Sequence, residues 1–340
     1  MYLKKRFVII LLSIPALFGI TYLGFYQLNL DFYIGDFNYS SNSLMANDAY
    51  RYKEIFEGYN YGELLIVLLN NKNLIPPTIP LYIMNGNLFL IYLLFFSSLF
   101  HAIIVVSSYI KNNFYLILLI FSPVVISNLF PASKEITAYI SGLYFLTYLL
   151  NKKREFLFYS IIFALFTRVE LVLVLLFLHF VLNISFLKRN KWRVFALFLI
   201  SFSMLLTIIN VDRGVIHIDE GVSSSILGVS FIYESLTKYG LYFIIYPFKF
   251  LHNLFKPILI INFSTLGSFF TFCSSFMFLV FSIIFIKNKS YKVNDYELIY
   301  SVLIYGIIFC AGGYIQHRYF VFLYPIFLYM AYEKFILKKK

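Results

Sequence analysis

The sequence predicts an all-α fold, a polytopic transmembrane bundle of about ten spans whose outer loops carry short interfacial helices. Hydrophobic residues make up 61% of the 340 residues, against roughly 45–50% in a soluble domain. Charged residues make up 13%, about half the usual share, and the mean hydropathy is +0.81. Such a chain has too little polar surface to coat a soluble globule, and the same figures exclude disorder and collagen.

The spans are predicted where about 20 apolar residues follow one another, or about 17–25 with tilt. The first runs from Phe7 to Phe25 behind Lys4, Lys5 and Arg6. No small-residue cleavage site follows it, so we interpret it as an uncleaved span rather than a signal peptide. The further spans are expected at about 86–109, 114–130, 135–150, 155–168, 170–187, 194–210, 264–286, 297–315 and 319–336.

The distribution of Lys and Arg predicts the orientation of the spans. With the N-terminus inside, most basic residues fall in clusters at the inner connections, for example at 152–154 and 188–193, and both termini are cytoplasmic. The net charge of +12 does not indicate a nucleic-acid partner, because the basic residues stand in short runs between apolar stretches. The outer cations are scattered and mixed with acids, so function is sought among them.

A single integral membrane domain over residues 1–340 is predicted, with one long outer loop in each half. The first loop, 27–85, is expected to hold one short interfacial helix at Leu64–Leu69. A break in regular structure is expected at its prolines, Pro76, Pro77 and Pro80.

The second outer loop, 211–263, is expected to hold an amphipathic helix at about 242–261. Lys249, His252 and Lys256 stand there at spacings of three and four, which is one helical face. We interpret this segment as an interfacial or re-entrant helix, with the three side chains as interface anchors. The two cysteines of the chain stand in apolar stretches, so neither a disulfide framework nor a metal site is predicted.

Arg168 and Glu170 are the first candidate site residues, because they interrupt an apolar run from Phe156 to Phe186. Ions within a membrane are costly and normally face the bundle interior or a cavity. The alternative is a turn between two helices whose side chains reach the interface. Glu170 is expected to bind substrate or to orient the arginine.

Lys134 and Glu135 are the second pair, at an outer turn. Ser133 is a plausible N-cap, and a helix N-terminus offers free N–H groups and positive potential to a phosphate. The alternative is an ordinary capped turn, which suits Glu135, whereas a lysine opposes the helix dipole.

His317 and Arg318 form a tight outer turn before the last span, so Arg318 is expected close to the mouth of the bundle. The alternative for Arg318 is snorkelling to lipid headgroups. In the first outer loop, Asp48 and Arg51 share a helical face, and a carboxylate beside a cation can act as a base or bind a sugar hydroxyl. The alternative there is a solvated amphipathic helix.

Four outer cations from four separate connections, Arg51, Lys134, Arg168 and Arg318, suggest a site for a lipid phosphate or diphosphate. Undecaprenyl diphosphate bearing a sugar would place its lipid among the spans, and the cations would stabilise the charge on the leaving diphosphate. Asp48 or Glu135 is the candidate base for the attacking sugar hydroxyl. This chemistry needs neither a metal nor a soluble cofactor, and the chain lacks a Walker-type phosphate loop.

This layout resembles the bacterial oligosaccharide repeat-unit polymerases, namely the O-antigen and capsule polymerases of the Wzy type and the EpsG-like proteins. The resemblance rests on short motifs: Asn47-Asp48-Ala49-Tyr50, Pro131-Ala132-Ser133-Lys134-Glu135, Thr167-Arg168, and His317-Arg318-Tyr319 with Pro325. It implies joining of repeat units on undecaprenyl diphosphate at the outer face of the bacterial inner membrane, with a chain-length regulator and a flippase as partners. Many members have a larger, arginine-rich second loop, whereas here that loop carries only Arg213.

Two alternatives stay open at this stage. One is a C-type glycosyltransferase that uses a polyprenyl-phosphate sugar, for which Asp31 and Asp36 are the candidate acidic pair. The other is a polysaccharide flippase or exporter, which needs cations at several depths of a central cavity, whereas here the cations are expected mainly at one face.

Overall fold

The protein is described by a computed structural model that covers residues 2–23, 75–129, 133–184, 189–208, 241–259, 266–287, 293–310 and 317–337. Every regular element in these ranges is a helix, which confirms the predicted all-α class for the described part of the chain. The helices are α1 (Tyr2–Phe18) with its π-helical continuation η1 (Gly19–Leu23), α5 (Ile75–Ile83), α6 (Leu88–Ser107), α7 (Asn113–Ile120), α8 (Pro123–Asn128), α9 (Lys134–Asn151), α10 (Arg154–Leu165), α11 (Val169–Asn183), α13 (Lys191–Ile208), α15 (Tyr242–Leu259), α16 (Leu266–Lys287), α17 (Val293–Cys310), the 3₁₀-helix η2 (His317–Leu323) and α18 (Tyr324–Leu337).

Helices occupy all ten of the segments predicted as spans. Two of them are long and apolar enough to cross a membrane, through Phe89–Ser107 of α6 and Ser268–Lys287 of α16, each with a mean hydropathy of 2.4. Other apolar helices in the described ranges are shorter. Membrane association is therefore indicated, and a ten-span bundle stays a prediction.

Prolines place two helix boundaries differently from the sequence prediction. The segment predicted as one span at 114–130 is divided into α7 and α8, because Ser122 caps α8 by accepting a hydrogen bond from the N–H of Val125 (3.2 Å) and Pro123 opens that helix. The break expected at Pro76, Pro77 and Pro80 is wrong, since Pro76 and Pro77 lie in the first turn of α5 and Pro80 lies inside the same helix. Backbone N–H groups in a first turn have no partner within the helix, so proline is tolerated there.

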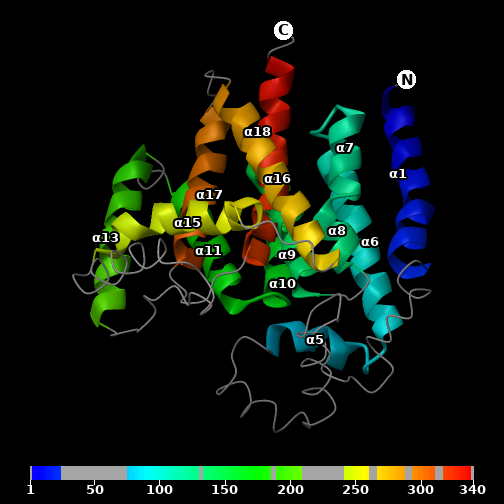
Figure 1. The fold of residues 1–340 in the computed structure, drawn as a ribbon, viewed down its shortest axis with the longest axis horizontal. Helices are drawn as coiled ribbons and strands as arrows, with labels where there is room; N and C mark the ends of the chain where they lie inside the picture. The colour runs from blue at the N-terminus through cyan, green and yellow to red at the C-terminus, as the bar shows by residue number, and fades with distance from the viewer. Residues whose placement is uncertain are drawn as a thin grey trace.

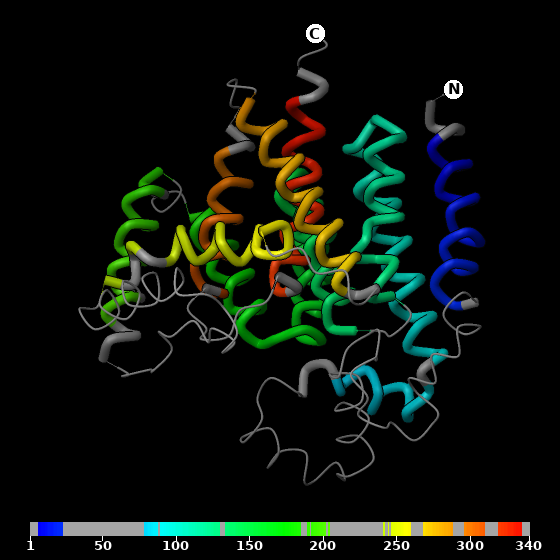
Figure 2. Tube along the Cα trace, viewed as in Figure 1, coloured from blue at the N-terminus to red at the C-terminus, as the bar shows by residue number. Residues whose placement is uncertain are grey.

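Figure 1 shows most helices upright, with α15 lying across them and α5 lying roughly crosswise below them. The N- and C-termini lie at the same end of the molecule, and we call the opposite end the distal end. The tube in Figure 2 shows α15, in yellow, crossing in front of the upright helices. The helix predicted at about 242–261 thus forms at Tyr242–Leu259, with a buried stripe at Tyr246, Phe250 and Leu254.

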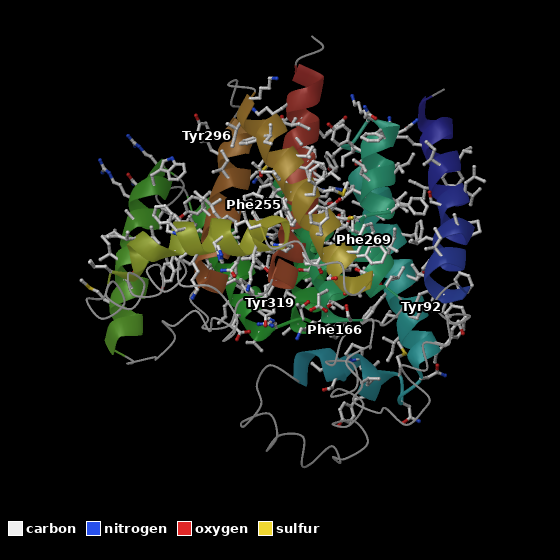
Figure 3. All side chains as sticks on the ribbon, in the orientation of Figure 1. Tyr92, Phe166, Phe255, Phe269, Tyr296 and Tyr319 are labelled. Atoms are coloured by element: carbon white, nitrogen blue, oxygen red, sulfur yellow. The ribbon has the colours of Figure 1, made fainter. Side chains whose placement is uncertain are left out.

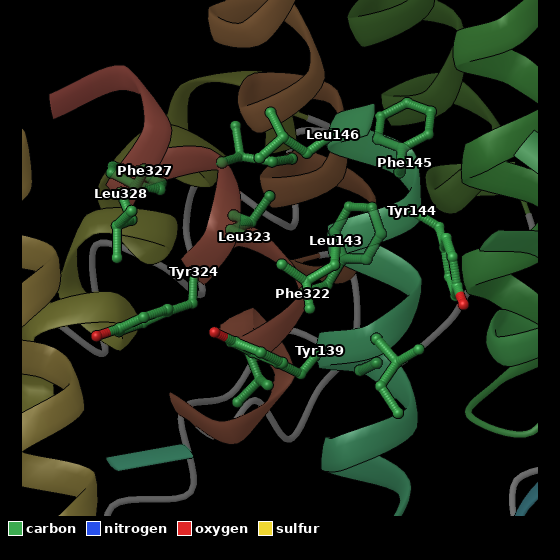
Figure 4. Close-up of a cluster of buried hydrophobic side chains, with 14 of the residues drawn as sticks. Tyr139, Leu143, Tyr144, Phe145, Leu146, Phe322, Leu323, Tyr324, Phe327 and Leu328 are labelled. Atoms are coloured by element: carbon green, nitrogen blue, oxygen red, sulfur yellow. The ribbon is translucent and has the colours of Figure 1, made fainter. Parts of the chain in front are cut away.

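The core is built around α9, whose side chains from Lys134 to Leu149 are all buried. The close-up in Figure 4 shows Tyr139 and Leu143 of α9 beside Phe322 of η2 and Tyr324 of α18. A Cβ atom added at Gly142 would lie 2.3 Å from the backbone oxygen of Phe322. Glycine at this position therefore lets the backbone of η2 rest directly on α9.

Polar contacts tie α9 to the helices around it along its length. The Ser141 hydroxyl donates to the carbonyl of Ser160 in α10 (2.8 Å), and the Ser160 hydroxyl donates back to the carbonyl of Ser141 (2.9 Å). Two further pairs join α9 to α6 and α11, namely Tyr144 with His101 (2.7 Å) and Tyr148 with His179 (2.7 Å), and Lys152, which caps the end of α9, pairs with Glu297 of α17. Such bonds between helices fix their register where the packing is otherwise apolar.

Candidate functional site

The candidate site lies where three connections meet: the start of α9, the turn between α10 and α11, and η2. The guanidinium carbon of Arg168 lies 3.8 Å from the centre of the Tyr319 ring. The hydroxyls of Thr137 and Thr167 lie 2.8 Å apart and share a hydrogen bond. Figure 3 shows Phe166 and Tyr319 in the distal half of the molecule, away from both termini. Three of the motifs singled out in the sequence are therefore neighbours in space.

Arg168 is held at the junction of two helices. Its N–H donates to the carbonyl of Ala164 (2.8 Å) at the end of α10, and its extended backbone (φ −163°, ψ 142°) occupies the N-cap position of α11. A cation at a helix N-terminus opposes the dipole, so helix electrostatics do not account for this arginine. Among the described residues, no hydrogen bond or ion pair engages its guanidinium, which rests on the Tyr319 ring.

Thr167 and Thr137 connect the Arg168 turn to α9. Each hydroxyl also lies within hydrogen-bonding distance of a backbone carbonyl in its own segment. The Thr137 hydroxyl is 2.8 Å from the carbonyl oxygen of Lys134, and the Thr167 hydroxyl is 2.9 Å from the carbonyl oxygen of Phe163. Both threonine side chains are buried. This small network sets the first turn of α9 against the turn that carries Arg168.

Lys134 and Glu135 are both buried, with exposed fractions of 7% and 5%. Ser133 occupies the predicted N-cap position, but the capping bond is wrong: its hydroxyl donates to Oδ1 of Asn128 (3.0 Å) and makes no bond to α9. The Ser133 hydroxyl is thus turned toward the side chain of Asn128, at the end of α8, and its oxygen accepts no hydrogen bond from the first N–H groups of α9. A lysine that is buried at the positive end of α9 does not agree with the alternative interpretation of this segment as an ordinary capped turn.

Glu170 stands apart from the arginine that it was expected to orient. Glu170 is exposed, and no ion pair joins its carboxylate to Arg168. Among the described residues, the side chain that contacts the Arg168 guanidinium is Tyr319. From the sequence, Tyr319 was named only as part of the His317-Arg318-Tyr319 motif. Spacing along the chain carried no signal for this contact, because the two residues belong to distant segments.

The remaining candidate residues are only partly covered by the structure. Asp48 and Arg51 lie outside the described residues, as do Asp31 and Asp36. The backbone of His317 and Arg318 opens η2, but their side chains lie outside the described part. Of the two candidate bases, Asp48 is therefore placed by the sequence alone, as are two of the expected cations, Arg51 and the side chain of Arg318.

Lys249 is not an exposed anchor, as its spacing with Lys256 had suggested. It is buried, with an exposed fraction of 8%, whereas Lys256 is exposed. The next residue, Phe250, packs its ring 5.2 Å from that of Phe320 in η2 and lies against Gly306 of α17. The other helices cover the middle of α15 but not its last turn. Lys249 and Lys256 therefore differ in exposure although their spacing puts them on one helical face.

Comparisons of the chain with protein-family models, with curated proteins and with solved structures found no match. In the described ranges, no group of three or more His, Cys, Asp and Glu side chains lies together. The geometry itself suggests an anion site: a half-buried guanidinium lies over an aromatic ring, in a turn that the Thr137–Thr167 hydrogen bond joins to the first turn of α9, where a lysine and a glutamate are buried. A guanidinium in this state has N–H groups at its edge that match two oxygens of a phosphate.

Proposed function

We propose that this chain is a multi-pass protein of the bacterial inner membrane that polymerises undecaprenyl-diphosphate-linked oligosaccharide repeat units at the outer face. The product would be an O-antigen, a capsule or an exopolysaccharide. The chain would act as a glycosyltransferase that needs no metal, in a lipid bilayer, with a chain-length regulator and a flippase as partners.

The membrane part of this proposal is supported by composition and by the placement of helices. Helices occupy the ten predicted spans, and two of them are long and apolar enough to cross. An even number of crossings returns the chain to the side where it began, which agrees with both termini lying at one end. Clusters of Lys and Arg in the inner connections favour the cytoplasm for that end.

The observation that carries the proposal is the stacked guanidinium of Arg168 beside the first turn of α9. In the proposed orientation this place lies at the outer face, which the lipid-linked donor reaches with its diphosphate. Arg168 would bind the diphosphate through its N–H edge, while the polyprenyl tail stays among the apolar helices. Lys134, Arg318 and Arg51 would add positive charge from other connections, and His317 and Glu170 would contact the sugars.

The reaction proposed is transfer of the growing chain from one lipid carrier to the next repeat unit. A hydroxyl oxygen of the acceptor sugar forms a bond to the anomeric carbon of the donor, and the bond from that carbon to the diphosphate oxygen breaks. The hydroxyl proton passes to a carboxylate, for which Glu135 and Asp48 are the candidates. The undecaprenyl diphosphate leaves with the bonding electrons, and Arg168 stabilises its developing charge.

The test is deletion of the gene in its native host, followed by gel analysis of the surface polysaccharide. We expect a lipid core capped by one repeat unit, restored to long polymer by the wild type. Arg168→Ala should lower polymerisation about 100- to 1,000-fold, the cost of one transition-state donor. Arg193→Ala, an exposed arginine of α13, serves as the matched control and should restore the polymer.

Two other results would replace the proposal. A long polymer that lacks one side-branch sugar would assign the chain to the C-type glycosyltransferases. Loss of all surface polymer, with lipid-linked units accumulating inside the cell, would assign it to the flippases or exporters. Full activity of Arg168→Ala at normal protein level would remove Arg168 from the site.

A further inference from the structure

We propose that Tyr319 is a positioning residue that holds the guanidinium of Arg168 in one plane, so that its N–H edge is ready for a lipid diphosphate. The inference rests on the proposed function, because it concerns the same anion site. It assigns a role to an aromatic side chain from η2, a segment distant in sequence from the α10–α11 turn.

The first support is the contact itself. The guanidinium carbon lies over the Tyr319 ring at 3.8 Å from its centre, well within the distance of about 6 Å at which a cation is attracted to an aromatic face. A guanidinium that rests on a ring engages its flat face, and its N–H groups then point outward in the plane. No described residue takes these N–H groups, so the ring orients the group without occupying the atoms that would bind an anion.

The second support is the way Tyr319 is itself held. The hydroxyl of Tyr305, in α17, donates a hydrogen bond to the backbone carbonyl of Tyr319. The Tyr305 ring stacks on Phe309, with 4.3 Å between ring centres, and on Phe322 of η2, with 4.9 Å between ring centres. The platform beneath Arg168 is thus fixed from α17 as well as from η2.

The third support is that Arg168 has no other described means of orientation. The nearest acid along the chain, Glu170, makes no ion pair with it. A free arginine side chain carries about 2 kcal/mol of rotamer entropy, which binding of an anion would have to overcome. A ring that orders the side chain beforehand reduces that cost, so its effect should appear in affinity for the diphosphate.

The test is a double-mutant cycle on the purified full-length chain in detergent, with radiolabelled farnesyl diphosphate as the probe. Tyr319→Leu should raise the dissociation constant about tenfold, while Tyr319→Phe, which keeps the ring, should stay within about twofold of the wild type. In an Arg168→Lys background, where no planar group remains to be stacked, Tyr319→Leu should add less than about twofold. Tyr159→Leu removes a partly exposed ring of α10 and serves as the control.

Equal effects of Tyr319→Leu in the wild-type and Arg168→Lys backgrounds would overturn the positioning role and leave the proposed function standing. Failure of the wild type to bind the probe would overturn both. If Tyr319→Leu does not fold, Tyr305→Phe provides the second variant, because it removes the bond to the Tyr319 carbonyl and keeps the ring stack. Tyr305→Phe should weaken binding two- to fivefold, about the effect of one lost hydrogen bond, and no change would count against the proposal.

Discussion

Thr167 is the residue that connects the Arg168 turn to the core of the bundle. Its hydroxyl, in the turn between α10 and α11, shares a hydrogen bond with that of Thr137 in α9, and both residues are buried. At the scale of single residues, the site therefore depends on one shared hydrogen bond and one stacked cation.

Thr167→Val should lower the free energy of unfolding by about 1–3 kcal/mol, because it leaves the buried Thr137 hydroxyl with one partner fewer. Thermal unfolding in detergent would measure the loss, and polymer length in the complemented deletion strain would measure the effect on the site.

Thr147→Val is the matched control for this change. Thr147 is also buried, but the one hydrogen bond of its hydroxyl to a described residue is to the carbonyl of Leu143 within its own helix (3.0 Å). Thr147→Val should lower the free energy of unfolding by well under half as much as Thr167→Val. Equal losses would show that the hydrogen bond between Thr137 and Thr167 does not contribute more to stability than a bond within one helix.

At the scale of elements, the position of η2 on α9 decides where Tyr319 stands. The two elements touch through backbone at Gly142 and through the rings of Phe145 and Phe322, whose centres are 5.8 Å apart. No side chain separates them at Gly142, so the approach is as close as backbone atoms allow.

Gly142→Ala should therefore be strongly destabilising, by about 1–3 kcal/mol or more, because the new Cβ would meet a backbone oxygen that cannot turn aside. Gly306→Ala is the comparison, since its Cβ would meet the Phe250 ring at 2.8 Å and a side chain can shift. The yield of folded protein and its unfolding temperature should fall clearly further for Gly142→Ala, and the reverse order would contradict this account of η2.

The burial of α15 can be tested separately. In a background where Cys273 and Cys310 are replaced by alanine, Lys256→Cys should react quickly with a water-soluble maleimide. Lys249→Cys should react at least about tenfold more slowly, because the bundle covers the middle of α15. Equal rates would mean that α15 lies free of the bundle.

At the scale of the whole molecule, the alternation of helices predicts which connections share a side. Both termini lie at one end, and the α8–α9 connection precedes a helix that begins at the distal end, where Arg168 lies. The basic clusters favour the cytoplasm for the end with the termini.

Reporter fusions would test this arrangement. Alkaline phosphatase fused after Leu129 should be active, since the enzyme works only outside the inner membrane, and the same enzyme fused after Lys340 should be inactive. Green fluorescent protein fused after Lys340 should fluoresce. The opposite pattern would place Arg168 on the cytoplasmic side and exclude the proposed reaction at the outer face.

Much of the fold could be predicted from the sequence, because helix positions follow from local properties. Runs of apolar residues predicted the segments 86–109 and 264–286, where α6 and α16 form. Proline placement was harder, since the same residue breaks a helix or begins one according to its position in the turn, as Pro76 and Pro123 illustrate.

The candidate site could be predicted only as a set of separate residues. Arg168 and Lys134 stood out because a charge in an apolar sequence is costly wherever the chain folds. Their association through Thr137 and Thr167, and the ring of Tyr319 beneath the arginine, join segments far apart in the chain. No periodicity within one helix reports on such contacts.

The sequence alone determined that the chain is strongly apolar, that the part described by the structure is helical, and that a few costly cations stand in its turns, because hydropathy and helix boundaries depend on neighbouring residues. Only the tertiary structure decided that η2 rests on α9 at Gly142, that Lys249 is covered and Lys256 is not, and that Tyr319 rather than Glu170 meets Arg168. These facts depend on how helices pack against one another, and packing is settled by the shapes of whole surfaces rather than by any one segment.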